Sequence, residues 1–178
     1  GFAGDLGGGS LELIDIAGTT LKQATTLPLG GLRLIDTSGG DLDRAVGITD
    51  QQVAAVPWIK AGEKRTFYAV GGTWRALAKL HMDEVGYPLR VMHGYVLPAD
   101  EVQRFAERLR RSKKLTDFKG IGSVAKQRRE VLPYGALVLE RLLKRLKPKD
   151  VMFSVYGIRE GLLYGLMSDD ERRRDPLK

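Results

Sequence analysis

The sequence predicts an α/β fold in which a mixed sheet of about five strands is flanked by helices. Three observations support this prediction. First, the chain opens with three extended runs separated by glycine-containing turns, which is typical of a β-meander. Second, a later β-rich run meets two glycines and is followed by apolar residues at the spacing of an amphipathic helix. Third, helical and β-rich segments alternate along the second half of the chain.

The opening strands are expected at Phe2–Leu6, Leu11–Ile16 and Leu21–Leu27. Between the first two lies a turn of three glycines and a serine, residues 7–10. Because glycine has no Cβ, the amides of this turn can point at one spot and an anion can approach the backbone. The turn is therefore a candidate phosphate cradle. Asp5 precedes it, and a magnesium ion or a polarised water between the two would relieve the repulsion between carboxylate and phosphate.

The segment after the third strand is expected to contain a loop and one helix. Pro28–Gly31 ends the strand, Leu32–Leu34 is interpreted as core, and the Ser, Gly and Asp residues of Thr37–Asp43 predict a loop. A helix is expected between Thr49 and Ile59, interrupted at Pro57.

The second glycine turn follows a predicted strand at Thr66–Val70 and consists of Gly71 and Gly72. A helix is expected directly after it, with Thr73 near its start. Strand, glycines and helix recur at phosphate sites, because free amides and the positive end of the helix dipole converge there. Taken alone, such a pair of glycines more often serves close packing. The apolar stripe of the helix comprises Trp74, Leu77, Ala78 and His81.

The next part of the chain predicts an extended segment at Val91–Leu97, and after it a helix with an arginine-rich outer face. The loop Lys119–Ser123 contains glycines, which turns and helix caps explain better than phosphate binding. A helical region is expected over Val124–Leu146, with a break or kink at Pro133. The apolar residues that define the arginine-rich helix are Val102, Phe105, Ala106 and Leu109.

The last strand is expected at Val151–Tyr156 and the last helix at Arg159–Met167. From Asp169 onward the charged residues predict an exposed end. The side chains of the last helix that are expected to turn inward are Leu162, Leu163, Leu166 and Met167.

Composition narrows the range of partners. The net charge of +7 favours a polyanion, and nucleic acid, polyphosphate and a highly phosphorylated nucleotide all fit. Basic residues concentrate between Arg104 and Lys149 and at 172–174. With 0 Cys there is no disulfide and no cysteine metal site, which is compatible with a cytoplasmic protein. No apolar run approaches membrane-spanning length and no signal peptide is recognisable, so no membrane partner is expected.

The segment Asp5–Leu13, DLGGGSLEL, resembles the second phosphate motif of the exopolyphosphatase and guanosine pentaphosphate phosphatase (Ppx/GppA) family. This family lies within the actin, sugar-kinase and heat-shock-chaperone superfamily. The resemblance extends over essentially the whole chain and keeps its order. Further matching segments are Leu27–Gly30, Tyr68–Thr73, Arg128–Gly135 and Gly157–Gly161.

The resemblance implies that residues 1–178 form the second, C-terminal lobe of a Ppx/GppA phosphatase domain with an actin-like (ribonuclease H-like) fold. It also implies a preceding lobe that this chain lacks, and it allows a further domain after Lys178. The complete protein would hydrolyse the terminal phosphoanhydride of polyphosphate or of guanosine pentaphosphate, with magnesium. The missing lobe would bring the first phosphate motif and the glutamate that activates water, so this half-site alone is expected to be inactive. A homodimer is compatible with the sequence.

The resemblance also implies roles for individual residues. Asp5 and Glu12 are the acids placed to hold magnesium or to orient water. Without the resemblance, Glu12 would be interpreted as a surface acid. Arg128 aligns with the arginine of the family's Arg-Ala-Asp segment, where Glu130 replaces the aspartate. The Arg159-Glu160 pair either stabilises the lobe or contacts phosphate. The full phosphate-binding set is Gly7, Gly8, Gly9, Ser10, Gly71, Gly72 and Arg128.

Two other functions remain open from the sequence. One is the ATP-binding lobe of a sugar or acetate kinase or of a chaperone-like ATPase, which should show an adenosine pocket around Gly71 and Gly72. The other is a non-catalytic module that binds guanosine polyphosphates or RNA through the region Arg104–Lys149. The second function predicts steeply salt-dependent binding without phosphate release.

Overall fold

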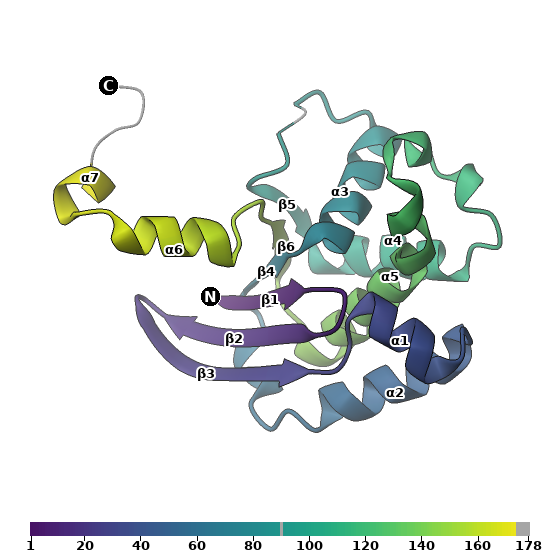
Figure 1. The fold of residues 1–178 in the computed structure, drawn as a ribbon, viewed down its shortest axis with the longest axis horizontal. Coiled ribbons are helices and arrows are strands. Elements are labelled where there is room, and N and C mark those ends of the chain that lie inside the picture. The colour runs from purple at the N-terminus through teal and green to yellow at the C-terminus, as the bar shows by residue number, and fades with distance from the viewer. Residues whose placement is uncertain (90, 174–178) are drawn as a thin grey trace.

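The computed structural model describes residues 1–89 and 91–173, and Figure 1 shows their fold. A six-stranded sheet has the order β3-β2-β1-β4-β6-β5. The predicted α/β class with a mixed sheet is confirmed, and the strand count exceeds the expected value by one. The strands are β1 (Phe2–Leu6), β2 (Leu11–Ala17), β3 (Thr20–Leu27), β4 (Thr66–Val70), β5 (Tyr95–Pro98) and β6 (Asp150–Phe153).

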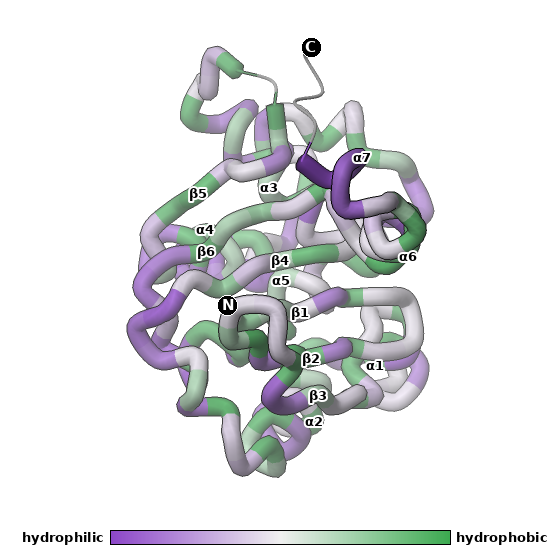
Figure 2. Tube along the Cα trace, turned by 90° about the vertical axis from the view of Figure 1, so that its left-hand side faces the viewer, coloured by the Kyte–Doolittle hydropathy of each residue, from purple (hydrophilic) through white to green (hydrophobic). Residues whose placement is uncertain are grey.

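Helices cover one face of this sheet. Figure 1 shows α1 to α5 gathered on one side, and Figure 2 looks onto the opposite face, beside which α6 lies. The helices are α1 (Gly31–Ser38), α2 (Leu42–Ala54), α3 (Gly72–Val85), α4 (Ala99–Arg111), α5 (Lys126–Leu146), α6 (Ile158–Leu166) and α7 (Asp169–Arg173). Short 3₁₀ turns occur at Ile59–Gly62, Leu115–Asp117 and Ile121–Ser123.

The core lies between the sheet and α3 to α5. Alternate residues of β1 and β2 point into it, as the period of two in these strands requires. Trp74 of α3 is fully buried, and its Nε1 donates a hydrogen bond to the carbonyl of Gly135 in α5 at 2.9 Å. Other fully buried side chains of the core are Phe2, Leu11, Leu13, Phe67, Leu80, Leu109 and Phe153.

The strand directions bring the predicted turns to one edge of the sheet. β1 pairs with β2 in an antiparallel manner, which confirms the start of the predicted meander, and β2 pairs likewise with β3. β1, β4 and β6 are parallel. Their carboxyl ends therefore lie at the same edge, where open α/β sheets bind ligands. Residues 7–10, 71–72 and 154–157 follow these three ends.

The region between β3 and β4 differs from the expectation. The helix expected at Thr49–Ile59 is α2, which begins at Leu42 and ends before Pro57. Asp41 caps it, since its Oδ1 accepts hydrogen bonds from the amides at 43 and 44 at 2.8 and 3.1 Å. The predicted loop Thr37–Asp43 shrinks to the three residues between α1 and α2. Ser, Gly and Asp residues favour loops, but here Asp41 is also the N-cap residue of α2.

α1 itself was not predicted, because its eight residues are too few for a clear helical period. It also changes the assignment of Leu32–Leu34 as core. Leu34 is fully buried, whereas Leu32 is 62% exposed. Residues two positions apart lie on the same face of an extended strand but point in different directions in a helix. Leu32 and Leu34 therefore cannot both face the core.

Two further boundaries are corrected by the structure. α5 continues through Pro133 as one helix, since buried residues on both sides of the proline hold it against its neighbours. The strand expected at Val91–Leu97 begins only at Tyr95. A turn precedes it, in which the amide of Tyr95 donates to the carbonyl of Met92 at 3.0 Å.

The largest difference concerns α6. Its apolar residues were expected to face inward, and none of its residues is buried. Helical periodicity identifies an apolar stripe but cannot show whether the same chain covers it. Residues 169–173, expected to be an exposed end, are exposed and form α7. The rest of the expected exposed end, residues 174–178, lies outside the described residues. The exposed fractions on α6 are 86% for Ile158, 67% for Leu162, 65% for Leu163, 56% for Tyr164 and 77% for Leu166.

Among the described residues, no helix has the length and apolar character needed to cross a membrane.

Candidate phosphate-binding site

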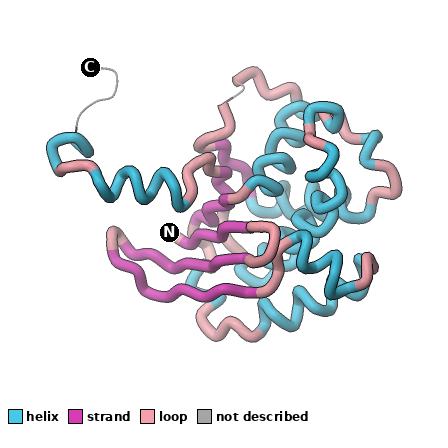
Figure 3. The backbone as a smooth tube through the Cα atoms, viewed as in Figure 1, coloured by secondary structure: helices cyan, strands magenta, loops and turns pink. Residues whose placement is uncertain are grey.

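The first part of the candidate site is the glycine turn between β1 and β2, which Figure 3 shows as a loop beside the start of α1. The amide of Gly7 donates to the carbonyl of Ser10 at 2.9 Å and closes the turn. The amides of Gly8 and Gly9 have no hydrogen-bond partner within residues 1–89 and 91–173, and both residues are exposed. Of the three glycine amides expected to bind phosphate, these two are therefore free to donate to a ligand.

The segment that follows β3 packs directly against this turn. A Cβ at Gly30 would lie 2.3 Å from the carbonyl carbon and oxygen of Gly8 and 2.4 Å from the carbonyl carbon of Gly9. The Gly8 carbonyl also accepts hydrogen bonds from the amides of Leu32 and Arg33, at 3.0 and 3.2 Å. The start of α1 thus fixes the turn from behind, and only glycine fits at position 30.

The second glycine turn touches the first. Gly71 has a φ of +112°, and a Cβ there would lie 2.4 Å from the carbonyl oxygen of Leu6. The parallel register of β1 and β4 places Asp5 opposite Val70, so both strands end at the same level. The two turns, which lie more than 60 residues apart in the sequence, are therefore neighbours in space.

The guanidinium group of Arg128 lies beside the first turn of α3. A Cβ at Gly72 would be 3.5 Å from its Cζ and Nη2 atoms. Arg128 belongs to the first turn of α5, is exposed, and forms no ion pair with another described residue. Close packing of Gly135 on Thr73, where a Cβ would meet Cγ2 at 2.3 Å, fixes α5 against the start of α3. A helix N-terminus with an unpaired guanidinium beside it favours an anion.

The two candidate acids face each other across the first hairpin. Asp5 and Glu12 are directly opposite in the β1–β2 ladder, so their side chains lie on the same face. Ser10 Oγ donates a hydrogen bond to Glu12 Oε1 at 2.6 Å. Burial raises the pKa of Asp5, the negative charge of Glu12 raises it further, and Arg75 acts in the opposite direction. The repulsion between the two partly buried carboxylates is thus only partly offset by Arg75.

Both acids line a groove of about 1030 Å³. The groove lies between α6 and the face of the sheet that α1 to α5 leave uncovered. Apart from Asp5, Glu12 and Glu160, the side chains that line it are almost all apolar. On the sheet these are Ala3, Ile14, Ile16 and Val70, and on the α6 side Tyr156, Ile158, Leu163, Tyr164 and Met167.

Arg75 is a residue of the site that sequence reasoning missed. Its Nη1 donates to the carbonyl of Val155 at 3.2 Å, in the link between β6 and α6. Its charge acts on Asp5 and on Glu160. Its position in the first helical turn after two glycines could have indicated a role in the site. The apolar residues around it indicated only that this helix packs against the core.

The Arg159-Glu160 pair lies at the start of α6. Glu160 Oε2 accepts a hydrogen bond from the amide of Gly157 at 2.8 Å, and this bond is the main reason why the pKa of Glu160 is lowered. Glu160 therefore caps α6. Arg159 is exposed.

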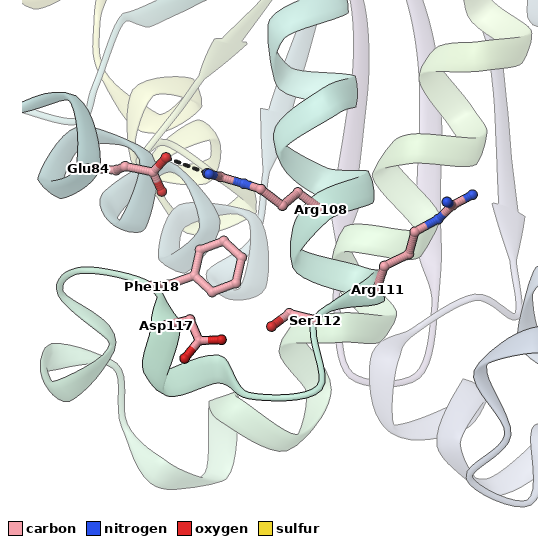
Figure 4. A pocket seen from close by; sticks show the side chains of 6 residues that line it. All are labelled: Glu84, Arg108, Arg111, Ser112, Asp117 and Phe118. Atoms are coloured by element: carbon pink, nitrogen blue, oxygen red, sulfur yellow. Dashed lines mark hydrogen bonds and ion pairs between the residues drawn. The ribbon is translucent and has the colours of Figure 1, made fainter.

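Two other features stay outside this site. In the loop Lys119–Ser123, Ser123 Oγ donates to the Gly120 carbonyl at 2.8 Å, as expected for a plain turn. A separate hollow of about 410 Å³ lies around Arg108 at the end of α4 (Figure 4). There Arg108 donates to Glu84 at 2.5 Å, and its guanidinium lies 5.2 Å from the ring centre of Phe118. The hollow shares no residue with the groove.

Comparison with known proteins gives a consistent result. Residues 2–170 match the model of the Ppx/GppA phosphatase family. No curated protein sequence matches the chain. The solved structures that resemble it include a Ppx/GppA phosphatase from Aquifex aeolicus, with a TM-score of 0.70 at 20% identity over 94% of this chain. An exopolyphosphatase-like protein gives 0.77 at 22% identity over 92%, and an exopolyphosphatase from Cytophaga hutchinsonii gives 0.74 at 21% over 93%.

At such low identity these likenesses show the fold, and they agree with the predicted fold class. The match covers 57%, 57% and 56% of the three solved chains. The present chain therefore spans little more than half the length of the structures that it resembles.

Proposed function

The chain belongs to the Ppx/GppA phosphatase family, and on this basis we propose that it supplies one half of a site that hydrolyses the terminal phosphoanhydride of inorganic polyphosphate or guanosine pentaphosphate. The observation that carries this proposal is the meeting of the two glycine turns. Gly71 touches Leu6, and Arg128 lies beside Gly72, so free amides and a guanidinium converge at one edge of the sheet.

Phosphoryl transfer requires positioning and charge stabilisation more than covalent chemistry from the protein. The amides of Gly8 and Gly9 donate to phosphate oxygens from one side. Arg128 donates from the other side, in a fixed fork that suits these oxygens. Glu12 orients the attacking water, and its bond with Ser10 holds its carboxylate in place.

Magnesium fits the donor set of Asp5 and Glu12. This ion is usually bound by one or two carboxylates together with substrate phosphates and waters, so two acids suffice on the protein side. The two carboxylates repel each other because they lie on one face of the hairpin, and burial also disfavours the charged form of Asp5. A divalent cation would relieve both effects. When bound, magnesium would neutralise charge that develops on the phosphoryl oxygens.

Residues 1–178 are, in this proposal, the second lobe of a longer phosphatase. The chain spans about 57% of its structural relatives, and the remainder of a complete protein would supply the other lobe. We place that lobe against the apolar face of α6, because this face is exposed and continues into the groove that contains Asp5 and Glu12. A lobe bound there would border both acids and close the groove that they line.

The double substitution Leu162→Glu with Leu166→Glu tests the placement of the other lobe against the apolar face of α6. Both side chains are largely exposed in the chain, so the double substitution should change its free energy of unfolding by no more than about 0.5 kcal/mol. In the complete protein, phosphate release should fall sharply, because two charges would be buried between the lobes. Leu21→Glu is the matched control, since Leu21 is 60% exposed on β3. Unchanged activity of the double variant, or association of the parent chain into homodimers through α6 in sedimentation, would contradict the placement.

Arg128→Gln tests the phosphate site in the chain itself. Removing one charge-assisted hydrogen bond should weaken tripolyphosphate binding by about 10-fold or more in titration calorimetry. Arg44→Gln, an exposed arginine of α2, is the control for lost net charge and should bind as the parent does. The complete protein is then assayed for phosphate release from polyphosphate and guanosine pentaphosphate. Equal binding by the Arg128 and Arg44 variants, or no turnover of either substrate, would count against the proposed function.

A further inference from the structure

Five arginines of the region 104–149 form ion pairs with nearby acids. Arg110 Nε, for example, donates to the fully buried Glu140 at 2.7 Å. Charges balanced in this way contribute little to the attraction of a distant polyanion. The arginine face therefore does not account for the binding of an anion. The other pairs are Arg104 with Asp100, Arg108 with Glu84, Arg111 with Glu107 and Arg141 with Asp50.

Exposed cations, most of them without an ion pair, also gather where β4 and β6 begin. Six exposed cations stand in and beside the two turns that lead into these strands, and we refer to them as the basic patch. Apart from Lys144, 3.5 Å from Glu140, none of them forms an ion pair within the part of the chain that the structure describes. Two acids lie close to these cations in the sequence, Glu63 in the first turn and Asp150 at the start of β6, and Oδ1 of Asp150 is buried. The patch consists of Lys60, Lys64, Lys144, Arg145, Lys147 and Lys149.

The backbone holds the two turns of the patch side by side. The amide of Lys64 donates to the carbonyl of Lys147 at 3.0 Å, and the amide of Lys149 donates to the carbonyl of Arg65 at 3.0 Å. Lys64 and Lys147 have φ angles of +59° and +50°, and no other non-glycine residue described by the structure has a positive φ. Glycine suits this conformation better. Because two neighbouring lysines occupy positions that favour glycine, we infer that the positive charge of their side chains has a function.

The position of the patch indicates which polyanion it fits. It lies at the amino ends of β4 and β6, the hydrophilic left edge in Figure 2, whereas the glycine turns follow the carboxyl ends of β1 and β4. Only an extended anion could reach both. Single-stranded RNA is bound mainly by stacking its bases on aromatic side chains. The exposed aromatic residues of the described chain, Tyr156 and Tyr164, line the groove and not the patch.

We propose that the basic patch is a second anion-binding site, which holds the distal part of a long inorganic phosphate chain whose end lies at the two glycine turns. The inference rests on the proposed function of those turns and selects polyphosphate over guanosine pentaphosphate as the substrate that gains from the second site. Lysine ammonium groups suit this role, because they bind phosphate oxygens as point charges without a required geometry.

The test is the binding of long-chain polyphosphate and of tripolyphosphate to the 178-residue chain over a series of salt concentrations. The patch variant is Lys64→Gly with Lys147→Gly, which removes two charges and gives both positions the residue that their backbone favours. Its melting temperature should be no lower than that of the parent. Two controls accompany it. Lys64→Arg with Lys147→Arg keeps the charge, and Lys22→Gln with Lys79→Gln removes two charges from exposed lysines elsewhere.

The patch variant should bind long-chain polyphosphate several-fold more weakly at low salt, and its tripolyphosphate affinity should equal that of the parent. The slope of log affinity against log salt should become shallower by about 1.4, since ~0.7 is lost for each contact removed from a single-stranded polyanion. Both controls should retain the parent affinity.

Three results would overturn the proposal. These are an equal loss in the Lys22 and Lys79 control, an unchanged affinity of the patch variant for the long chain, and single-stranded RNA that binds as tightly and loses the same factor. Failure of the glycine turns is recognised separately, because Arg128→Gln would then leave tripolyphosphate binding intact.

Discussion

Alanine at position 30 is expected to destabilise the fold by about 3 kcal/mol and to displace the glycine turn of residues 7–10. The added Cβ would lie 2.3 Å from the carbonyl carbon and oxygen of Gly8. These are backbone atoms, so no side chain can rotate away to make room. The backbone angles of Gly30, φ −61° and ψ 147°, suit any residue, and the loss would therefore come from the collision alone.

The measurement is urea unfolding together with tripolyphosphate binding. Gly47→Ala is the matched control, because Gly47 lies in α2 and an added Cβ there meets nothing within 4 Å. This control should gain about 0.5–1 kcal/mol, as expected for alanine in place of glycine within a helix. If Gly30→Ala were as stable as the parent and bound tripolyphosphate equally well, the support of the turn by segment 28–31 would be disproved.

Glutamine at position 12 is expected to reduce phosphate release by the complete protein by a factor of about 10² or more. The amide can still accept the hydrogen bond from Ser10 but cannot serve as a base or hold a cation through charge. The loss should appear in kcat more than in KM, because Glu12 acts on the water and the metal. Asp43→Asn, at an exposed acid of α2 outside the site and the basic patch, should retain parental activity.

The 178-residue chain allows an independent check of the same substitution. Burial is the main cause that raises the pKa of Asp5, and the charge of Glu12 is the second. Glu12→Gln removes the second cause, so the pKa of Asp5, measured by NMR titration, should fall while remaining raised by burial. A pKa of Asp5 that does not respond would show that the two carboxylates do not face each other.

Local patterns were sufficient to predict the first hairpin and both glycine turns. The alternation in Leu11–Ile16 and the glycines at 7–9 each report on their own backbone. The contact between Gly71 and Leu6 depends on parallel pairing between distant segments, which no local spacing indicates. The resemblance implied that both turns bind phosphate. Arg75 was missed for the same reason, because its partner Val155 lies 80 residues away.

The exposed stripe of α6 marks a different limit. Leu162 and Leu166 have the spacing of a buried helix face, and the prediction assumed that this chain covers it. A pattern of apolar residues reports a preference for burial, but the partner that satisfies this preference need not lie in the same chain. α1 shows a different case, because no side chain caps its start. The amides of Leu32 and Arg33 donate to the carbonyl of Gly8 instead, a contact between distant segments that no local pattern indicates.

The contact of Gly71 with Leu6 also bears on selectivity. Because Gly71 packs directly on the main chain of Leu6, the distance between the two glycine turns is fixed by the pairing of β1 with β4. An anion that bridges both turns must match this distance. The site would therefore select ligands by the spacing of their negative charges and not by the groups attached beyond them.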